Sequence, residues 1–316
     1  MRKVVLFGVP EYGNMGDIAI TYAETQFIKD NFSQYELLEI LEDDIEKNIS
    51  EIKNIISDED ILFLQGGGNL GDEYVSFEET RRLIVNTFPN NKIVIMPQTI
   101  HFSDTEVGKV ELEKSKEAYN NHKYLTVIAR EEVSYEIMKK EFYKANVILA
   151  PDIVMYLDKT DDNIKRDGVT LFLRDDAEKV LTEGDSKQIN DVISKYYNNI
   201  LHTDTHIGDE IKITKEIREK MLEPKLQEAR EAELVITDRL HGMIFAAITS
   251  TPCIAFGNYN HKITSSFKWL EHLNYIKYIE DVGKLEETVE ELRKLKEHKY
   301  NNEFAQKLHK QILKYV

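Results

Sequence analysis

Short β-branched apolar runs alternate with stretches of helical periodicity along most of the chain. In the first half, these runs predict strands at Lys3–Val9, Glu36–Leu41, Ile61–Gln65, Lys92–Met96, Leu125–Ala129 and Val147–Ala150. Helical patterns between them cover Asp17–Phe32, Ser76–Phe88 and Glu131–Phe142. Strands that alternate with helices are typical of a parallel sheet covered on both faces, so we predict an α/β fold.

A polar stretch at residues 158–168 interrupts this alternation and predicts a linker. A second series follows, with strands predicted at Val169–Leu173, Ile200–Thr203, Leu234–Thr237 and Cys253–Phe256 and helices at Asp185–Tyr197, Thr214–Arg230 and Leu240–Thr249. We therefore expect a Rossmann-like lobe at 1–157, a second one at 169–282 and a helical tail at 283–316. Two doubly wound lobes predict a functional cleft between them that faces the carboxyl ends of the strands.

The composition narrows the class of protein. Of 316 residues, 41 are Lys or Arg and 57 are Asp or Glu, so the formal net charge is −16. Such acidity argues against a nucleic-acid binder, which needs a basic face. One cysteine cannot form an internal disulfide, and no apolar run approaches membrane-spanning length. We expect a cytoplasmic protein in which an anionic substrate would be held by a few local cations.

The charge is unevenly distributed. Residues 292–316 contain seven Lys or Arg and two Glu, a net charge of +5, which leaves −21 on the rest of the chain. A basic tail of this kind favours either peripheral contact with an anionic membrane or a solvated helix that packs across the two lobes.

Two glycine-rich loops follow strands in the first half. The first, Gly8–Asp17, lacks the Lys-Ser/Thr pair of a nucleotide P-loop. Its Gly13 and Gly16 suit either a close approach to a ligand or a tight turn capped by Asp17. The second, Gln65–Asp72, has no acid after the next strand to hold a ribose, so we do not expect a nicotinamide cofactor there. Its glycines predict backbone amides that face polar ligand atoms.

Polar side chains follow two further strands of the first half. Gln98 and His101 come after the strand that ends at Met96, where they suit either a hydroxyl-rich ligand or local backbone groups. Arg130 ends a strand and opens a helix, where it suits either a bound anion or a salt bridge to a local glutamate.

The second half carries the sharpest pattern, because two consecutive strand ends present cations. The strand that ends at Thr237 leads into Asp-Arg-Leu-His-Gly, which places Arg239 and His241 in the first turn of a helix. Arg174 follows an earlier strand, and Lys262 lies beyond the next one. Cations at strand ends and helix N-termini are typical of an anion site, so Arg239 and His241 are our leading candidates.

Two other features have simpler explanations. His202, Asp204 and His206 share one face of an extended segment, but no further ligand lies nearby in the sequence, so we do not predict a metal site. Cys253 lies in an apolar strand and is expected in the core rather than as a nucleophile.

Together these blocks resemble the polysaccharide pyruvyl transferase family. The resemblance rests on the order and spacing of Gly13–Asp17, Gln65–Asp72, Pro97-Gln98, Arg130, Ala150–Asp152, Arg174 and Asp238–Gly242. It implies a glycosyltransferase-B-type fold of two Rossmann-like lobes with the active site in the inter-lobe cleft. The implied reaction moves a pyruvyl group from phosphoenolpyruvate onto two hydroxyls of a sugar or a lipid-linked oligosaccharide, forming a cyclic ketal in surface polysaccharide synthesis.

The resemblance also assigns roles to residues. Arg239 and His241 match the family's catalytic Arg-Leu-His block. Donor-binding residues are expected in both lobes, at Arg174, Arg130, Lys262 and Gly242. Lys262 keeps a cation where the family often has Asp-Pro-Lys, whereas this chain has Asn260-His261 before it. Acceptor-binding residues are expected in the glycine-rich first half, at Asn14, Asp17, Gly67, Gly68, Asn69 and Gln98.

The chemistry of these residues agrees with that reading. Guanidinium groups suit both the phosphate and the carboxylate of phosphoenolpyruvate, and an imidazole at His241 suits proton transfer near neutral pH. We expect no metal and no cofactor, with phosphoenolpyruvate as a co-substrate. Two alternatives stay open, because fold does not decide function: a glycosyltransferase that uses a nucleotide sugar, or a non-catalytic sugar-binding partner.

Overall fold

The computed structural model describes residues 2–175, 179–208, 210–257 and 262–316. These residues form two compact α/β units. Unit 1 consists of Met1–Glu11, Asp17–Tyr156 and Glu303–Val316, and unit 2 consists of Tyr12–Gly16 and Leu157–Asn302. None of the described helices is long and apolar enough to cross a membrane.

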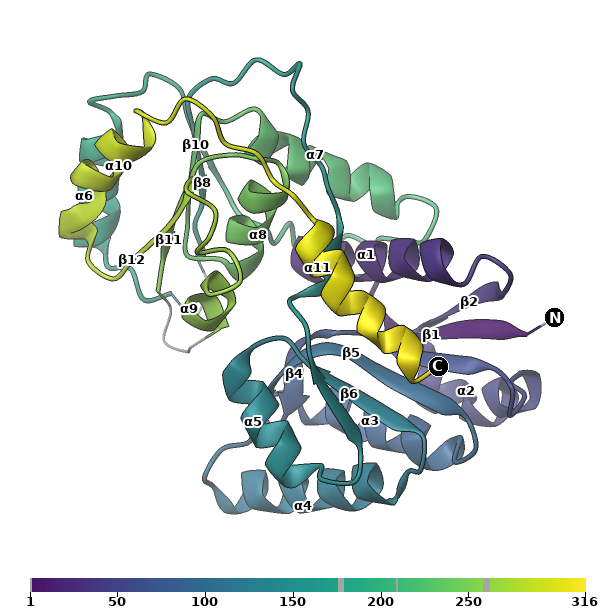
Figure 1. The fold of residues 1–316 in the computed structure, drawn as a ribbon. Helices are drawn as coiled ribbons and strands as arrows, with labels where there is room; N and C mark the ends of the chain where they lie inside the picture. The colour runs from purple at the N-terminus through teal and green to yellow at the C-terminus, as the bar shows by residue number, and fades with distance from the viewer. Residues whose placement is uncertain (1, 176–178, 209, 258–261) are drawn as a thin grey trace. The chain divides into compact units, whose positions relative to one another are not determined.

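Unit 1 is built around a parallel sheet (Figure 1). Its strands are β1 (Lys3–Val9), β2 (Glu36–Leu41), β3 (Ile61–Leu64), β4 (Gly67–Gly71), β5 (Lys92–His101), β6 (Leu125–Ala129) and β7 (Asn146–Leu149). Its helices are α1 (Met15–Asn31), α2 (Glu42–Ile55), α3 (Val75–Thr87), α4 (Glu106–Asn121), α5 (Glu132–Glu141) and α11 (Glu303–His309), with 3₁₀ turns at Ile153–Tyr156 and Lys310–Lys314. The strand order is β2-β1-β3-β5-β6-β7, and β4 pairs with the second half of β5.

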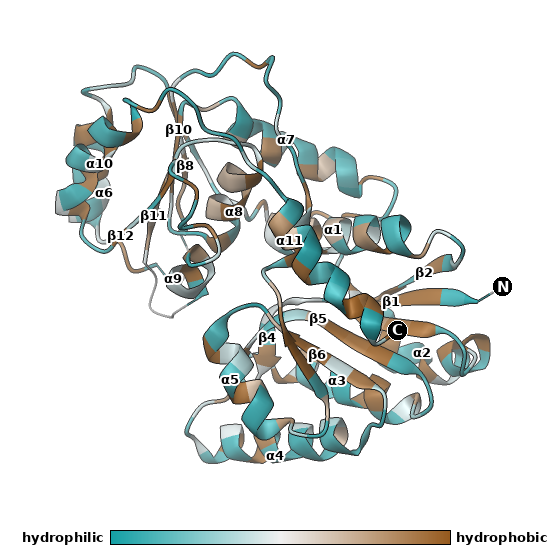
Figure 2. Ribbon diagram, viewed as in Figure 1, coloured by the Kyte–Doolittle hydropathy of each residue, from teal (hydrophilic) through white to brown (hydrophobic). Residues whose placement is uncertain are grey.

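Both faces of this sheet are covered. Helices α2 to α5 share one apolar cluster with the strands, whose members include Phe7, Leu64, Ile84 and Phe142. Helix α1 lies on the other face, where the rings of Phe27 and Phe63 have centroids 6.4 Å apart. Figure 1 shows α1 and α11 on the side of the sheet opposite α3 and α4. Hydrophobic residues accordingly gather in the strands, while the outer helix surfaces are hydrophilic (Figure 2).

Unit 2 repeats this architecture with a smaller sheet. Its strands are β8 (Val169–Phe172), β9 (Ile200–Thr203), β10 (Leu234–Thr237), β11 (Cys253–Phe256) and β12 (Ile276–Ile279), in the order β12-β11-β10-β8-β9. Its helices are α6 (Glu183–Ile193), α7 (Arg218–Arg230), α8 (Leu240–Ile248), α9 (Lys262–Phe267) and α10 (Leu285–Leu292), with a 3₁₀ turn at Val282–Lys284. One apolar cluster joins α6 and α10 to the strands, and α8 packs on β10 and β11.

The structure confirms the predicted α/β class and parallel sheets, but it differs from the expected loop after Met96. Strand β5 continues through Gln98 to His101, and the predicted ligand loop Gly67–Gly71 is itself strand β4. The glycines are needed for this pairing, because a Cβ atom on Gly71 would collide with the carbonyl oxygen of His101. The three glycines of β4 therefore hid this strand from the sequence analysis, because they leave few side chains to form a pattern.

The sequence pattern predicts a C-terminal tail that is helical throughout, and the structure differs from this prediction. Helix α10 ends at Leu292 and α11 begins only at Glu303. Between them the chain binds Ser250 of unit 2, whose carbonyl oxygen lies 2.7 Å from His298 Nδ1 and whose hydroxyl accepts the Tyr300 N–H at 2.7 Å. The predicted linker at 158–168 also packs on unit 2, since Arg166 donates to the carbonyl of Thr249 at 2.9 Å.

The end of the tail docks on unit 1 through a buried histidine. His309 is fully buried, and its Nε2 lies 2.8 Å from the carbonyl oxygen of Pro151. Its ring also contacts Tyr156, with centroids 6.0 Å apart. Burial lowers the pKa of His309 to about 4, so the folded protein keeps this ring neutral at ordinary pH.

We predict that His309 makes stability fall between pH 6.5 and 4. In that window the unfolded chain binds a proton that the folded chain does not, which costs up to about 3 kcal/mol of stability. His309→Gln is expected to flatten this part of the curve of unfolding free energy against pH, measured by urea denaturation. The exposed His101→Gln is the control, and equal slopes for His309→Gln and wild type would contradict the prediction.

Candidate functional site

The candidate site lies where the strand order of unit 2 reverses. Strands β8 and β10 are parallel neighbours, yet the chain leaves β8 toward β9 on one side and leaves β10 toward β11 on the other. In open α/β sheets, ligands bind outside the carboxyl ends of the strands at such a switch point. Arg174 follows β8 after one residue, and Asp238 and Arg239 follow β10 directly.

Asp238 links the carboxyl ends of strands β8 and β10 through a hydrogen bond. Its Oδ1 accepts the backbone N–H of Arg174 at 2.9 Å, and its side chain is 3% exposed. Burial raises the pKa of Asp238 to about 6, while that hydrogen bond and the charges of Arg174 and Arg239 act in the opposite direction. Both predicted cations therefore lie within electrostatic reach of one buried carboxyl group.

Arg239 is bound by Asp204, which lies at the end of a third strand. Asp204 follows β9, which is the other neighbour of β8. Its Oδ1 accepts from Arg239 Nε at 2.8 Å and its Oδ2 from Arg239 Nη2 at 2.6 Å. Both side chains are largely buried, at 14% and 23% exposure for Arg239 and Asp204. This two-point contact fixes the plane of the guanidinium group, which a single contact would leave free to rotate.

The turn from β10 into α8 is tight. Thr237 Oγ1 donates to the carbonyl of Phe172 at 2.8 Å and accepts the backbone N–H of Arg239 at 2.9 Å. A Cβ atom on Gly242 would collide with this Thr237 hydroxyl, so the close packing requires glycine. The structure thus gives Gly242 a packing role, and its donor-binding role stays a prediction.

His241 lies in the first turn of α8, against the segment Tyr12–Gly16. That segment pairs with the chain after β9, since Met15 N donates to Thr205 O and Ile207 N to Gly13 O, both at 2.9 Å. A Cβ atom on Gly16 would collide with the imidazole of His241. Gly16 therefore permits a close approach as predicted, but the nearest neighbour is a side chain of the protein.

Asn14 belongs to unit 2 rather than to the N-terminal lobe where we had expected it. Its backbone forms an antiparallel bridge with His206, and its Oδ1 accepts the N–H of Gly16 at 3.0 Å. The side chain thus shapes the start of α1. Its predicted contact with an acceptor stays a prediction.

The other predicted residues of the first lobe lie in unit 1. Arg130 is 3% exposed, and its guanidinium donates to Asp152 at 3.0 Å and to Thr99 at 2.7 Å. The alternative weighed against donor binding, a salt bridge to a local glutamate, is also present, because Arg130 Nε lies 3.8 Å from Oε2 of the adjacent Glu131. The remaining residues are the predicted acceptor ligands Asp17 on α1, Gly67, Gly68 and Asn69 on β4 and Gln98 on β5.

Gln98 and Asn69 hold one another. Gln98 is fully buried, and its Nε2 donates to Gln65 O at 2.9 Å and to Asn69 Oδ1 at 3.3 Å. Arg81 donates to Asn69 as well, at 3.1 Å to the carbonyl oxygen. Gln98 is thus a supporting residue within β5, whereas Asn69 is only partly buried.

Lys262 and His261 complete the predicted set. Lys262 opens α9 in unit 2, and its role stays a prediction. His261 lies outside the described residues, as does Asn260.

Two of the residues weighed as metal ligands have protein partners in the described part of unit 2. His206 Nδ1 accepts from Gly208 N at 3.2 Å, and Asp204 pairs with Arg239. Across the described chain, no group of three His, Cys, Asp or Glu residues is placed to hold a metal ion.

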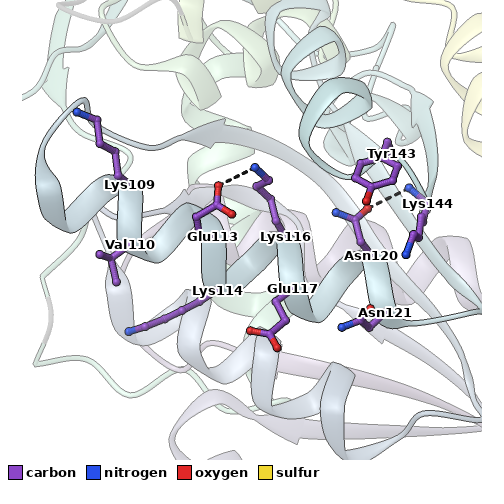
Figure 3. A pocket seen from close by; sticks show the side chains of 10 residues that line it. All are labelled: Lys109, Val110, Glu113, Lys114, Lys116, Glu117, Asn120, Asn121, Tyr143 and Lys144. Carbon is purple, nitrogen blue, oxygen red and sulfur yellow. Dashed lines mark hydrogen bonds and ion pairs between the residues drawn. The ribbon is translucent and has the colours of Figure 1, made fainter.

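A depression over α4 offers a contrast with this site. Its lining is a set of helix-surface side chains, in which Lys116 pairs with Glu113 at 2.6 Å (Figure 3). The charges there are of both signs, and no carboxyl end of a strand contributes to the lining. It therefore lacks the features that single out the switch point of unit 2.

Two carboxylates, Asp204 and Asp238, were absent from the residues that the sequence proposed. Asp238 stands beside Arg239 in the sequence, but only its burial against Arg174 reveals its part in the site. Asp204 was weighed as a metal ligand, and the signal that it pairs with Arg239 is its place at the end of the strand beside β8.

Comparisons with known proteins give a consistent result. A family model for polysaccharide pyruvyl transferase matches residues 14–261. The chain is 42% identical over 295 residues to General stress protein 30 of Bacillus subtilis, covering 92% of this chain and 85% of that protein. It is 28% identical over 273 residues to Pyruvyl transferase 1 of Schizosaccharomyces pombe, covering 82% and 67%. Its fold resembles UDP-GlcNAc 2-epimerase of Methanocaldococcus jannaschii, with a TM-score of 0.53 at 16% identity over 100% of both chains.

We predict that Asp204 and Arg239 stabilise unit 2 jointly. Asp204→Asn is expected to lower the free energy of unfolding by about 1–3 kcal/mol, because a largely buried guanidinium loses its charged partner. A double-mutant cycle with Arg239→Gln, followed by denaturant unfolding, measures the coupling between the two side chains. The control is Asp191→Asn, an exposed residue of α6. Additive effects of the two substitutions would contradict the prediction.

Proposed function

Because the chain belongs to the polysaccharide pyruvyl transferase family and has a glycosyltransferase-B-type fold, we propose that it transfers a pyruvyl group from phosphoenolpyruvate to a sugar. The observation that carries this proposal is the grouping of Arg174 and Arg239 around Asp238, with His241 two residues further on in the same turn. Two guanidinium groups suit a donor that carries both a phosphate and a carboxylate.

The proposed reaction begins with proton transfer from His241 to the methylene carbon of phosphoenolpyruvate. This leaves an oxocarbenium-like centre, which a first sugar hydroxyl attacks while it gives its proton back to His241. The C–O bond to phosphate then breaks, and a second hydroxyl of the same sugar closes the cyclic ketal and gives its proton to the departing phosphate. Arg174 and Arg239 stabilise the charge of the donor and of the departing phosphate.

Each group has a reason for its place in this mechanism. Asp204 presents the guanidinium of Arg239 in a fixed plane, which suits a transition state that must be met without reorganisation. His241 lies in the first turn of α8, whose N-terminal N–H groups also favour a bound anion. We propose no metal or cofactor for the reaction, since phosphoenolpyruvate serves as a co-substrate.

The proposed setting is polysaccharide synthesis in the cytoplasm, with a sugar or lipid-linked oligosaccharide as acceptor. The exposed Lys307, Lys310 and Lys314 of the tail support contact with an anionic membrane. In sedimentation with phosphatidylglycerol vesicles, the wild type is expected to pellet with the vesicles. A variant with these three lysines replaced by glutamine is expected to stay in the supernatant. Equal sedimentation of both proteins would remove the membrane contact from the proposal.

We predict separable effects for the cations and the histidine. Arg174→Gln is expected to weaken phosphoenolpyruvate binding about 10- to 100-fold in calorimetry, as expected for loss of a charged hydrogen bond. His241→Asn is expected to keep that affinity and to slow transfer by about 10²- to 10⁴-fold, measured by mass spectrometry of glycans that gain a pyruvyl ketal.

The control for both variants is Lys220→Gln, an exposed residue of α7. Near-wild-type transfer by His241→Asn would contradict the mechanism, and unchanged phosphoenolpyruvate binding by Arg174→Gln would contradict the donor site.

A thermal-shift panel separates this function from a nucleotide-sugar glycosyltransferase. Phosphoenolpyruvate is expected to raise the melting temperature, and a response to nucleotide sugars alone would favour the glycosyltransferase.

A further inference from the structure

Asp238 has a buried carboxyl oxygen that receives no hydrogen bond from the described part of the protein. Its Oδ1 accepts the backbone N–H of Arg174 at 2.9 Å. Its Oδ2 is shielded from solvent, and no described residue donates a hydrogen bond to it. An ionised oxygen in this position is costly, because it has lost its hydration without gaining a partner. A proton on Oδ2 lowers that cost, since the carboxyl group then carries no charge.

The position of Asp238 makes its charge important for a ligand. It follows β10 directly and is hydrogen-bonded to the chain just beyond β8, so it lies at the switch point of unit 2. Asp238 is 3% exposed and Arg174 is 7% exposed. Charges at this edge of the sheet are therefore weakly screened by water, and an anion bound there would act on the Asp238 carboxyl without touching it.

Charged groups from neighbouring segments act on this carboxyl. Burial raises the pKa of Asp238 to about 6, against the charges of Arg174 after β8 and Arg239 before α8. Asp204 after β9 holds Arg239 in a two-point ion pair, which offsets the charge of that guanidinium group. His241, in the first turn of α8, is a further titratable group of this region. The protonation of Asp238 thus depends on how far its two arginine neighbours are neutralised.

An anion bound by the guanidinium groups would change this balance. The phosphate and carboxylate of phosphoenolpyruvate offset the charges of Arg174 and Arg239, which in the free site favour the ionised form of Asp238. They also bring like charge close to the Asp238 carboxylate. Both effects raise the pKa of a carboxyl group. Because the pKa of Asp238 is already about 6 in the free site, a further rise protonates it at neutral pH.

We propose that Asp238 takes up one proton from solvent when phosphoenolpyruvate binds, so that the donor meets a positively charged site instead of a neutral one. This inference rests on the proposed function and adds Asp238 to it as a positioning residue. In the neutral state Oδ1 still accepts the Arg174 N–H, because the proton lies on Oδ2. The contact between the two strand ends is therefore kept, while the repulsion between donor and carboxylate disappears.

The test is calorimetry of phosphoenolpyruvate binding to the full-length chain at pH 7, in two buffers of different ionisation enthalpy. The difference in heat gives the number of protons taken up. Asp238→Asn is the informative variant, because its amide oxygen can still accept the Arg174 N–H but the side chain cannot bind the proton. The donor phosphate itself titrates near this pH, so the two proteins are compared. Wild type is expected to take up more protons than the variant, with a difference of up to about one.

The pH profile of donor affinity is a readout that a purely structural role would not change. Between pH 6 and 8, the affinity of wild type is expected to fall about tenfold more than that of Asp238→Asn, because binding favours the protonated carboxyl. At pH 8 the variant should bind at least as tightly as wild type, since it has the charge of the protonated acid. A structural defect would instead weaken binding equally at every pH.

The matched control is Asp191→Asn, an exposed aspartate of α6 that should show wild-type proton uptake. His241→Asn, which is expected to keep donor affinity, shows whether the imidazole takes the proton instead. Infrared difference spectroscopy of wild type adds a measurement that needs no variant. Binding of phosphoenolpyruvate should produce the C=O stretching band of a protonated carboxylic acid.

Three outcomes would overturn the inference: equal proton uptake by wild type and Asp238→Asn, loss of the uptake in His241→Asn, or absence of the carboxylic acid band. The proposed function is tested by donor binding itself. If wild type binds phosphoenolpyruvate with the same proton uptake as Asp238→Asn, the inference fails and the function stands. If wild type does not bind phosphoenolpyruvate at any pH, both fail.

Discussion

The central strands of both sheets are buried on both faces, and this burial decides where chemistry can occur. Every residue of β3, β6, β8, β10 and β11 is buried. A charged side chain inside such a strand would lose its hydration without recovering it, so charge appears only beyond the last strand residue. Arg174, Asp204 and Arg239 all occupy that position at neighbouring strands of unit 2.

Burial on two faces also explains how much of the fold the sequence predicts. Strands of this kind are continuous apolar runs, and β1, β6, β10 and β11 have the bounds that the pattern predicted. The more exposed β2 and β9 also have their predicted bounds. Strand β4 was missed because Gly67–Gly71 has almost no side chains to show a pattern. The extension of β5 to His101 was missed because Pro97 normally ends a strand, and only its pairing with β4 shows that the strand continues.

The site residues divide along a similar line. Arg174, Arg239 and His241 are visible in the sequence, because each lies just after an apolar run. Asp204 is not, since its bond to Arg239 depends on β9 lying beside β8, a contact between distant parts of the chain. Gly16 shows an intermediate case. The sequence indicates a close approach at this glycine, but only the fold shows that His241 is what approaches it.

The formal charges around Arg174 and Arg239 balance locally, although the chain as a whole is acidic. Arg174 and Arg239 face Asp204 and Asp238, so the four formal charges cancel when both carboxyls are ionised. Attraction for an anion then cannot come from net charge, and it depends on the direction in which the guanidinium groups point. The raised pKa of Asp238, about 6, adds a second control, because protonation of this carboxyl leaves the site with a positive charge. A protein with a net charge of −16 can in this way hold an anion through geometry and one titrating carboxyl.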